Sequence, residues 1–314
     1  MNNNSPTKLS IEYTLQAIHI NTRERKESSG RFAVNSYSNL AMFYKDLRLY
    51  DQALVYYDST AMLVKKFPEQ YNFILSSRLH RSDIFFHTGN YQQSIDESSA
   101  GFLESKKRYD TSWMLSFLNQ KAQSQYYQGE LPEAIYAADN AIAFANYQLE
   151  QYQKIHLSGS TGAMTQVYFE LSTAFKTKAL IYEDMGKDSL AELFFERAIK
   201  ERILSVVNND FGQVAGDYND FGNFYLNSLE SFKKANACYL KTLEYAKKTE
   251  DVERISKAYL NLGQSYYLQL NYKLAEYYYA KSLSQLGIIA SPDFLQQPTS
   301  NELNRIVNKE FTLV

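Results

Sequence analysis

The feature that most constrains this chain is a pair of small residues that recurs along the sequence at a nearly fixed separation. The two members lie 12 residues apart in five segments and 13 apart in a sixth. Two antiparallel helices joined by a short turn approach most closely where both facing side chains are small. The spacing therefore predicts six antiparallel helical hairpins, each with one crossing pair: Ala41 and Ala53, Ser82 and Ser94, Ala122 and Ala134, Ala179 and Ala191, Gly222 and Ala235, and Gly263 and Ala275.

Large side chains flank the crossing pairs at helical spacing. In the last hairpin Tyr259, Leu262 and Tyr266 surround Gly263, and Tyr279 follows in the second helix. Residues at i, i+3, i+4 and i+7 share one helix face, so these side chains are expected to fill the space beside the crossing. The second and third hairpins depart from the pattern, with Ser98 and Ala138 at the place of the second-helix aromatic residue and Arg81 and Lys121 at the place of the leucine.

This arrangement resembles the tetratricopeptide repeat (TPR), in which an aromatic residue, Leu-Gly and Tyr in a first helix precede Ala and an aromatic residue in a second. The resemblance implies an all-α, right-handed superhelical solenoid of antiparallel helix hairpins. Successive hairpins start farther apart than the usual 34 residues, for example 41 from Gly222 to Gly263, so each helix is expected to be about a turn longer. The expected segments are an N-terminal capping helix in 1–31, six hairpins within 32–290 (about 32–68, 71–107, 111–156, 163–206, 213–249 and 252–287) and a C-terminal helix in 291–314.

An insertion separates the third and fourth hairpins. The interval from Ala122 to Ala179 is 57 residues, and the excess lies in 146–164, which contains Ser-Gly-Ser-Thr-Gly at 158–162. This composition predicts a long second helix to about residue 155, a flexible loop and a long following helix. The loop does not resemble a phosphate-binding loop, because no strand precedes it and no Gly-Lys-Ser/Thr completes it. Turns within hairpins are marked by Gly89, Gly129 and Gly186, where a helix C-terminus needs a permissive backbone.

Composition excludes several classes of protein. The net charge of −2 and pI near 6.2, with both signs interspersed, provide no basic footprint for nucleic acid or an anionic membrane. No apolar run approaches the roughly 18 residues of a membrane span, and the N-terminus has no apolar stretch typical of a secretory signal. Cys238 is the only cysteine, so no intramolecular disulfide can form. We expect a cytoplasmic protein that contacts neither nucleic acid nor membrane.

The C-terminal segment shows a second resemblance. It is similar to the linker that follows TPR arrays in bacterial proteins with a C-terminal caspase-like CHAT peptidase domain, through Leu283, Leu286, Pro292-Asp293-Phe294, Asn301, Leu303 and Ile306. The sequence ends on the apolar stretch 311–314 without a helix cap, which predicts that the chain continues into another domain. The resemblance implies a sensor or regulatory arm whose peptidase lies elsewhere. The alternative is the regulatory domain of a bacterial signalling or transcription-control protein.

Candidate chemical sites are few. His80, Asp83 and His87 stand at i, i+3 and i+7 on one helix and could ligate a metal, but no further Cys or His is close in sequence, so a polar lining is favoured. Cys238 is expected to be a packed small residue and not a nucleophile, because no base can be assigned to it. We therefore expect no catalytic residue, cofactor or metal in this chain, and keep a metal-dependent enzyme as the remote alternative.

The remaining candidate is the concave surface of the solenoid, lined by first-helix residues out of phase with the packing face. Amides dominate this set, and Asn and Gln can hold an extended peptide through both donor and acceptor while Tyr adds apolar contact. A clamp for a C-terminal carboxylate is not favoured, because the required lysines are missing. The expected ligand is a protein or peptide partner, or a C-terminal domain of the same polypeptide. The predicted groove residues are Asn39, Lys45, His80, Asp83, His87, Asn119, Gln123, Tyr126, Lys176, Glu183, Asn219, Asn223, Asn227, Asn261, Gln264 and Tyr267.

Overall fold

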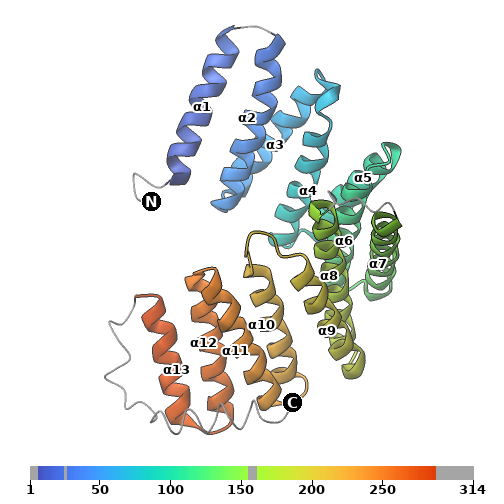
Figure 1. Ribbon diagram of the computed structural model, residues 1–314. Helices are drawn as coiled ribbons and strands as arrows, with labels where there is room; N and C mark the ends of the chain where they lie inside the picture. The colour runs from blue at the N-terminus through green and yellow to red at the C-terminus, as the bar shows by residue number, and fades with distance from the viewer. Residues whose placement is uncertain (1–5, 25–26, 155–160, 288–314) are drawn as a thin grey trace. The chain divides into compact units, whose positions relative to one another are not determined.

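The structure is a computed structural model that describes residues 6–24, 27–154 and 161–287. Within these residues the chain contains thirteen α-helices, one short 3-10 helix and no strand (Figure 1). None of the described helices combines the length and apolar character needed to cross a membrane. The predicted all-α architecture of sequential hairpins is confirmed.

The chain divides into two compact units, Met1–Ala141 and Ile142–Val314, and the boundary falls within one helix, α7. The first unit contains α1 (Pro6–Glu24), α2 (Glu27–Asp46), α3 (Tyr50–Val64), the 3-10 helix η1 (Pro68–Gln70), α4 (Asn72–His87), α5 (Tyr91–Lys107), α6 (Thr111–Gln128) and the first part of α7 (Leu131–Lys154). The second unit contains the rest of α7, then α8 (Thr161–Asp184), α9 (Asp188–Leu204), α10 (Gly212–Asn227), α11 (Phe232–Lys248), α12 (Val252–Leu268) and α13 (Tyr272–Gln285).

Helices that follow one another in sequence pack together in each unit. The hairpins α2–α3 and α4–α5 form in the first unit, and α8–α9, α10–α11 and α12–α13 form in the second (Figure 1). First helices of successive hairpins are also in contact: α2 with α4, α4 with α6, and α10 with α12. Each unit therefore has a first-helix face, made by α2, α4 and α6 in the first unit and by α8, α10 and α12 in the second.

The crossing pairs lie at the centres of the hairpins. Both members of the pairs Ala41–Ala53, Ala122–Ala134 and Ala179–Ala191 are fully buried. In the α4–α5 hairpin the hydroxyls of Ser82 and Ser94 are 2.8 Å apart, which fits two helices at close approach. A Cβ atom placed on Gly222 or Gly263 would lie 2.5 or 2.6 Å from the ring of Tyr239 or Tyr279, so each glycine leaves room for a tyrosine.

Three hairpins contain a second-helix aromatic ring between two first-helix rings. Tyr56 lies between Tyr37 and Tyr44, with ring centroids 6.0 and 5.3 Å away. Tyr278 lies in the same way between Tyr259 and Tyr266, at 6.2 and 5.4 Å. The α8–α9 hairpin repeats the arrangement with Phe194 between Phe175 and Tyr182, at 5.9 and 5.4 Å. These ring triplets place large apolar area at the hairpin interface, where aromatic pairs pack favourably.

The turns and the insertion behave largely as the sequence predicts. Gly89, Gly129 and Gly186 have φ values of 77°, 88° and 65°, in the left-handed region that favours glycine. Both α7 and α8 are 24 residues long, as the insertion predicted. One correction is that α8 begins at Thr161, so Gly162 is helical and not part of the predicted loop. Residues 155–160 of that loop and the predicted helix in 291–314 lie outside the described residues.

The N-terminal helix α1 packs against α2. α2 begins at Glu27, five residues ahead of the expected start of the first hairpin at position 32, so the predicted boundary of the capping segment needs correction.

Candidate functional site

The first-helix face of the first unit has a cluster of charged side chains. Lys45 comes from α2, while His80, Asp83 and His87 come from α4. The Lys45 ammonium lies 2.5 Å from a carboxylate oxygen of Asp83 and 3.3 Å from Nδ1 of His80. Nε2 of His87 lies 3.3 Å from the other oxygen of Asp83. The structure therefore brings together four predicted groove residues from two successive hairpins.

The proton affinities in this cluster follow from burial and from the central ion pair. Burial and the neighbouring Lys45 charge lower the pKa of His80 to about 4, so this imidazole is neutral near pH 7. Burial alone would raise the pKa of Asp83, but hydrogen bonds from His87 and Lys45 outweigh it and lower this pKa to about 2. The hydrogen bond to Asp83 raises the pKa of the more exposed His87.

The spacing of His80, Asp83 and His87 suggested a metal site, but in the structure Asp83 forms an ion pair with Lys45 instead. Lys45 is bonded to the carboxylate that a metal would need and also contacts one imidazole. Across residues 6–24, 27–154 and 161–287, no group of three or more His, Cys, Asp or Glu side chains is arranged to hold a metal ion. A cation supplied by the protein therefore occupies the centre of the cluster.

The other predicted groove residues of the first unit are placed differently. Asn39 and Gln123 are half-buried, and Tyr126 contacts the neighbouring ring of Tyr127 at 5.0 Å. Asn119 is only 2% exposed, so its amide lies within the packing of α6 and not on the surface.

In the second unit, Lys176 connects α8 to α10. Its ammonium lies 3.0 Å from Asp217 and 2.5 Å from Asp220, and these two carboxylates outweigh the effect of burial and raise the pKa of Lys176. Arg202, near the end of α9, donates from Nε to Asp217 at 2.8 Å and is 4% exposed. Asp217, Asp220 and Arg202 were not among the predicted groove residues, because their partners are remote in sequence and Arg202 lies on a second helix. The only available signal was the separation of 41 residues between Lys176 and Asp217, which equals one repeat.

Glu183, the penultimate residue of α8, accepts a hydrogen bond of 2.6 Å from Ser228. Burial raises the pKa of Glu183, while the bond from Ser228 acts in the opposite direction. This second contact again joins residues of successive hairpins.

Three predicted amides form a ladder between α10 and α12. Nδ2 of Asn261 donates to Oδ1 of Asn219 at 2.7 Å and to Oδ1 of Asn223 at 3.5 Å. The hydroxyl of Tyr239 on α11 also donates to Oδ1 of Asn223, at 3.0 Å. Asn219 and Asn261 are 4% and 9% exposed, whereas Asn223 is half-buried. These bonds fix the orientation of the three amides.

The ladder leaves one donor and one acceptor without a protein partner. Nδ2 of Asn223 donates to no described residue, and Oδ1 of Asn261 accepts from none. Around them Asn227, Gln264 and Tyr267 are exposed, and Tyr267 contacts Tyr272 edge to face at 5.6 Å. This part of the first-helix face thus offers oriented amides beside exposed polar and aromatic side chains.

Cys238 is buried as expected. Burial raises the pKa of its thiol to about 12, which keeps it protonated at neutral pH and unsuited to nucleophilic attack. Residues 159–160 of the Gly-Ser-Thr-Gly segment lie outside the described residues, and the other two open α8.

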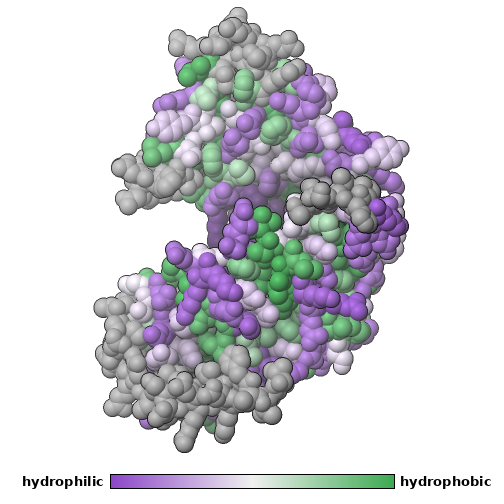
Figure 2. All heavy atoms as spheres, viewed as in Figure 1, coloured by the Kyte–Doolittle hydropathy of each residue, from purple (hydrophilic) through white to green (hydrophobic). Residues whose placement is uncertain are grey.

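A further exposed surface was not identified from the sequence. Hydrophobic side chains gather at the end of α9 and along the connection to α10 (Figure 2), where Ile203, Leu204 and Val207 are 40%, 49% and 50% exposed. The sequence did not indicate that these side chains are exposed, because apolar residues near a helix end are equally typical of the hydrophobic core.

Comparisons with known proteins identify the fold. No family model matches the sequence, and no curated protein matches it. Similar solved structures include a Rap protein complexed with competence and sporulation factor, at 14% identity and a TM-score of 0.59, with 99% of this chain and 88% of that chain covered. The Rap conjugation gene regulator of the plasmid pLS20, in complex with the Phr* peptide, matches at 16% identity and a TM-score of 0.55, covering 92% and 80%.

A third similar structure is BtubC (BKLC) from P. vanneervenii, at 13% identity and a TM-score of 0.53, covering 90% of this chain and 92% of that one. At such low identities the likeness concerns the fold alone. Together with the crossing pairs and the sequential hairpins, it shows that this chain has the fold of a TPR-like helical repeat protein.

Proposed function

We propose that this chain is a binding scaffold that holds an extended peptide segment on the first-helix face of its second unit. The peptide main chain accepts a hydrogen bond from Nδ2 of Asn223 and donates one to Oδ1 of Asn261. Asn227, Gln264 and Tyr267 contact its side chains. The scaffold itself supplies binding and orientation, and no chemical step.

The amide ladder is the observation that carries this proposal. Asn219, Asn223 and Asn261 are held by one another and by Tyr239, so the free donor and acceptor are oriented before a ligand arrives. Preorganised groups lose little conformational entropy on binding, which favours affinity. An amide pair that offers both a donor and an acceptor matches a peptide backbone, which carries both at every non-proline residue.

The comparisons support the class of ligand. Two of the similar structures, the Rap protein with competence and sporulation factor and the pLS20 Rap regulator with the Phr* peptide, contain a bound factor or peptide. We extend this to a regulatory role, in which peptide binding to this chain controls another protein. The sensor arm of a CHAT peptidase, which the resemblance of the C-terminal segment implies, has no support of this kind. Most of the residues that carry that resemblance lie in 288–306, outside the described part of the chain.

The test is selection of peptides from a displayed random library on the immobilised full chain, followed by affinity measurement with a labelled peptide. The informative variant is Asn223→Asp, which keeps the oxygen that accepts from Tyr239 and Asn261 but removes the free donor. We expect this variant to weaken peptide binding by about tenfold or more, because the peptide carbonyl then faces a carboxylate.

Gln213→Glu is the matched control. It makes the same amide-to-carboxylate change at an exposed position of the same helix, ten residues earlier and so about 15 Å away along the axis. Equal affinities for wild type and Asn223→Asp would place the peptide elsewhere, and failure to select any peptide would contradict the scaffold itself.

A further inference from the structure

A cavity of about 370 Å³ lies between α6 and α7 in the first unit, and none of the predicted groove residues lines it. Leu118, Lys121 and Gln125 of α6 line it, together with Tyr136, Ala137 and Asn140 of α7. The cavity lies at a position where other hairpins of this chain place a large side chain. We therefore trace the cavity to a small residue at that position of the repeat.

The missing group is an aromatic ring. Ala137 follows its crossing residue Ala134 by three positions, as Tyr56, Phe194 and Tyr278 follow theirs. In those hairpins this position carries the central ring of the aromatic triplet. In α6–α7 it carries only a methyl group, and the flanking residues are Leu118 and Gln125 in place of rings.

A lysine lies beside the position that lacks a ring. Lys121 directly precedes the crossing residue Ala122, as Lys178 directly precedes Ala179 in α8–α9. There the Lys178 ammonium lies 4.5 Å from the centroid of the Phe194 ring, a distance suited to cation–π attraction. Lys121 has neither an ion pair nor a ring contact with any described residue.

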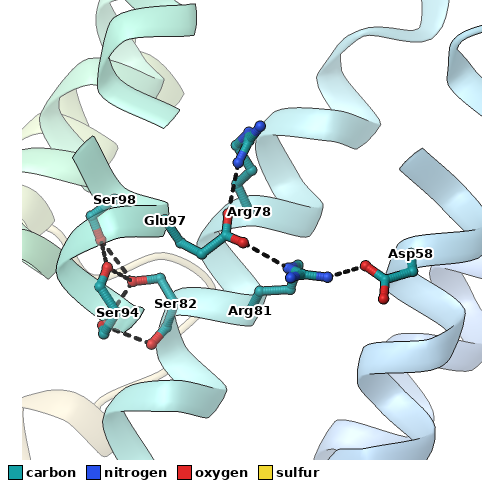
Figure 3. A network of polar contacts seen from close by, with 7 residues as sticks. All are labelled: Asp58, Arg78, Arg81, Ser82, Ser94, Glu97 and Ser98. Atoms are coloured by element: carbon teal, nitrogen blue, oxygen red, sulfur yellow. Dashed lines mark hydrogen bonds and ion pairs between the residues drawn. The ribbon is translucent and has the colours of Figure 1, made fainter. Parts of the chain in front are cut away.

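The α4–α5 hairpin solves the same problem with charge. Glu97 is its residue at the ring position, and Arg81 is at the position equivalent to Lys121. Glu97 accepts a hydrogen bond of 3.0 Å from Arg81 and one of 2.8 Å from Arg78 (Figure 3). Arg81 also pairs with Asp58 of the preceding hairpin (Figure 3). Thus the cation at this position meets a ring in one hairpin and a carboxylate in another, and in α6–α7 its partner is absent.

The cavity also contains an unused hydrogen-bond acceptor. Gln125 is 7% exposed, and its Oε1 has no hydrogen-bond partner among the described residues. A buried acceptor without a donor costs free energy that a donor from a ligand would recover. A carboxylate in the cavity would face this oxygen and the nearby Glu133, which also lines the wall, so it is disfavoured.

We propose that the α6–α7 cavity binds a tyrosine side chain presented by a protein partner. The ring takes the place that Phe194 and Tyr56 occupy in their own hairpins, under the Lys121 ammonium and against Leu118 and Ala137. The phenol hydroxyl donates to Oε1 of Gln125. This is a second interaction surface, formed by residues that the peptide proposal does not use.

The test uses p-cresol, the side-chain fragment of tyrosine, with toluene and propionate as probes of the ring and of a carboxylate. Saturation-transfer NMR on the full chain detects binding, and titration gives affinities. The dissociation constant of p-cresol is expected on the order of millimolar, as suits so few atoms, with toluene weaker and propionate silent. No p-cresol signal at about 10 mM, equal affinity for toluene, or tighter binding of propionate overturns the proposal.

Ala137→Phe supplies the ring from within and is expected to abolish p-cresol binding. Ala237→Phe is its control, since it adds the same ring at an exposed position of α11. Unchanged binding to Ala137→Phe overturns the proposal. Circular dichroism checks that the variant folds, and peptide capture by the second unit is expected to persist.

Two milder variants decide the matter if Ala137→Phe does not fold. Lys121→Gln removes the cation and is expected to weaken p-cresol binding about two- to fivefold. Gln125→Leu removes the acceptor and is expected to abolish the preference for p-cresol over toluene. Unaltered p-cresol affinity in both variants contradicts the assignment.

Discussion

At the scale of single residues, some turns place glycine at a left-handed backbone position and others place a residue with a side chain there. The turn after the first helix needs a left-handed residue seven positions beyond the crossing residue, and Gly89, Gly129 and Gly186 meet this need. Arg48 and Leu270 occupy the same turn position with φ values of 58° and 59°. A side chain in this region costs about 1–2 kcal/mol relative to the right-handed helix, so these two turns carry local strain.

Leu270→Gly is expected to stabilise the second unit. The substitution relieves the left-handed strain, and the loss is small because the leucine side chain is 73% exposed. After the extra chain entropy of glycine is subtracted, a net gain of about 0.5–1 kcal/mol remains. Urea denaturation measures it. Leu270→Ala is the control, because it removes the same side chain and keeps the strain; a Leu270→Gly protein no more stable than Leu270→Ala would contradict this account.

Among the helical elements, the hairpins solve one packing problem in several ways. In α4–α5 the second-helix aromatic residue is replaced by Ser98, whose hydroxyl oxygen lies 2.6 Å from that of Ser82 (Figure 3). Ser94 of the same hairpin is 2.7 Å from Ser124 on α6. A buried network of hydroxyls therefore replaces ring packing here. The sequence showed the missing ring, but not the hydrogen bonds, since these depend on rotamers at three helices.

Gly263→Ala is expected to destabilise α12–α13 by about 1–3 kcal/mol, because the new methyl group would lie 2.6 Å from the Tyr279 ring. Gly216→Ala makes the same change in the interior of α10, where nothing lies within 4 Å of the new atom. It is expected to stabilise by about 0.5–1 kcal/mol through helix propensity. Thermal melting of both variants compares them. Equal effects would mean that the glycine at the crossing is not needed for close approach.

The contact between α2 and α4 is expected to make stability depend on pH. The pKa of His80 is lowered in the folded state from its ordinary 6.5 to about 4, so between these values the unfolded chain binds more protons. Stability therefore falls as pH drops from about 6.5 to about 4, by about 1–3 kcal/mol. His87 has a raised pKa and acts in the opposite sense, since its contribution is lost as pH rises above its ordinary value.

His80→Gln is therefore expected to flatten the pH profile of unfolding free energy, and His87→Gln to steepen it. Denaturation at a series of pH values between about 4 and 7 measures both. Profiles that shift in the same direction would show that the charges of the cluster do not act as assigned.

At the scale of the whole molecule, the chain consists of two compact units whose contacts run between neighbouring elements. Energetics in such repeat proteins are approximately a sum of local terms and nearest-neighbour interfaces. A change in one unit should thus have its main effect on the adjacent hairpins. The buried pair of Arg202 and Asp217, which joins α9 to α10, offers a place to test this.

Asp217→Ala is expected to destabilise the second unit by about 3–5 kcal/mol, because it leaves Arg202 buried without its carboxylate. Hydrogen exchange should speed up in α8, α9 and α10 while α4 and α5 keep their protection. Faster exchange throughout both units would contradict the local character of the array. Asp188→Ala, at a less buried aspartate in the first turn of α9, is the comparison.

The sequence by itself determined the number and pairing of the helices in the described residues, the crossing pairs and the glycine turns. These follow from periodicity and backbone geometry within about 40 residues, which a single sequence displays. Only the tertiary structure decided which first-helix residues meet across hairpins. Lys45 with Asp83, Lys176 with Asp217, and Asn219 with Asn261 depend on the rotation and register of separate helices, and spacing within one helix does not set these. The α6–α7 cavity has the same origin, because a missing ring leaves a cavity only where no neighbouring side chain moves in to fill it.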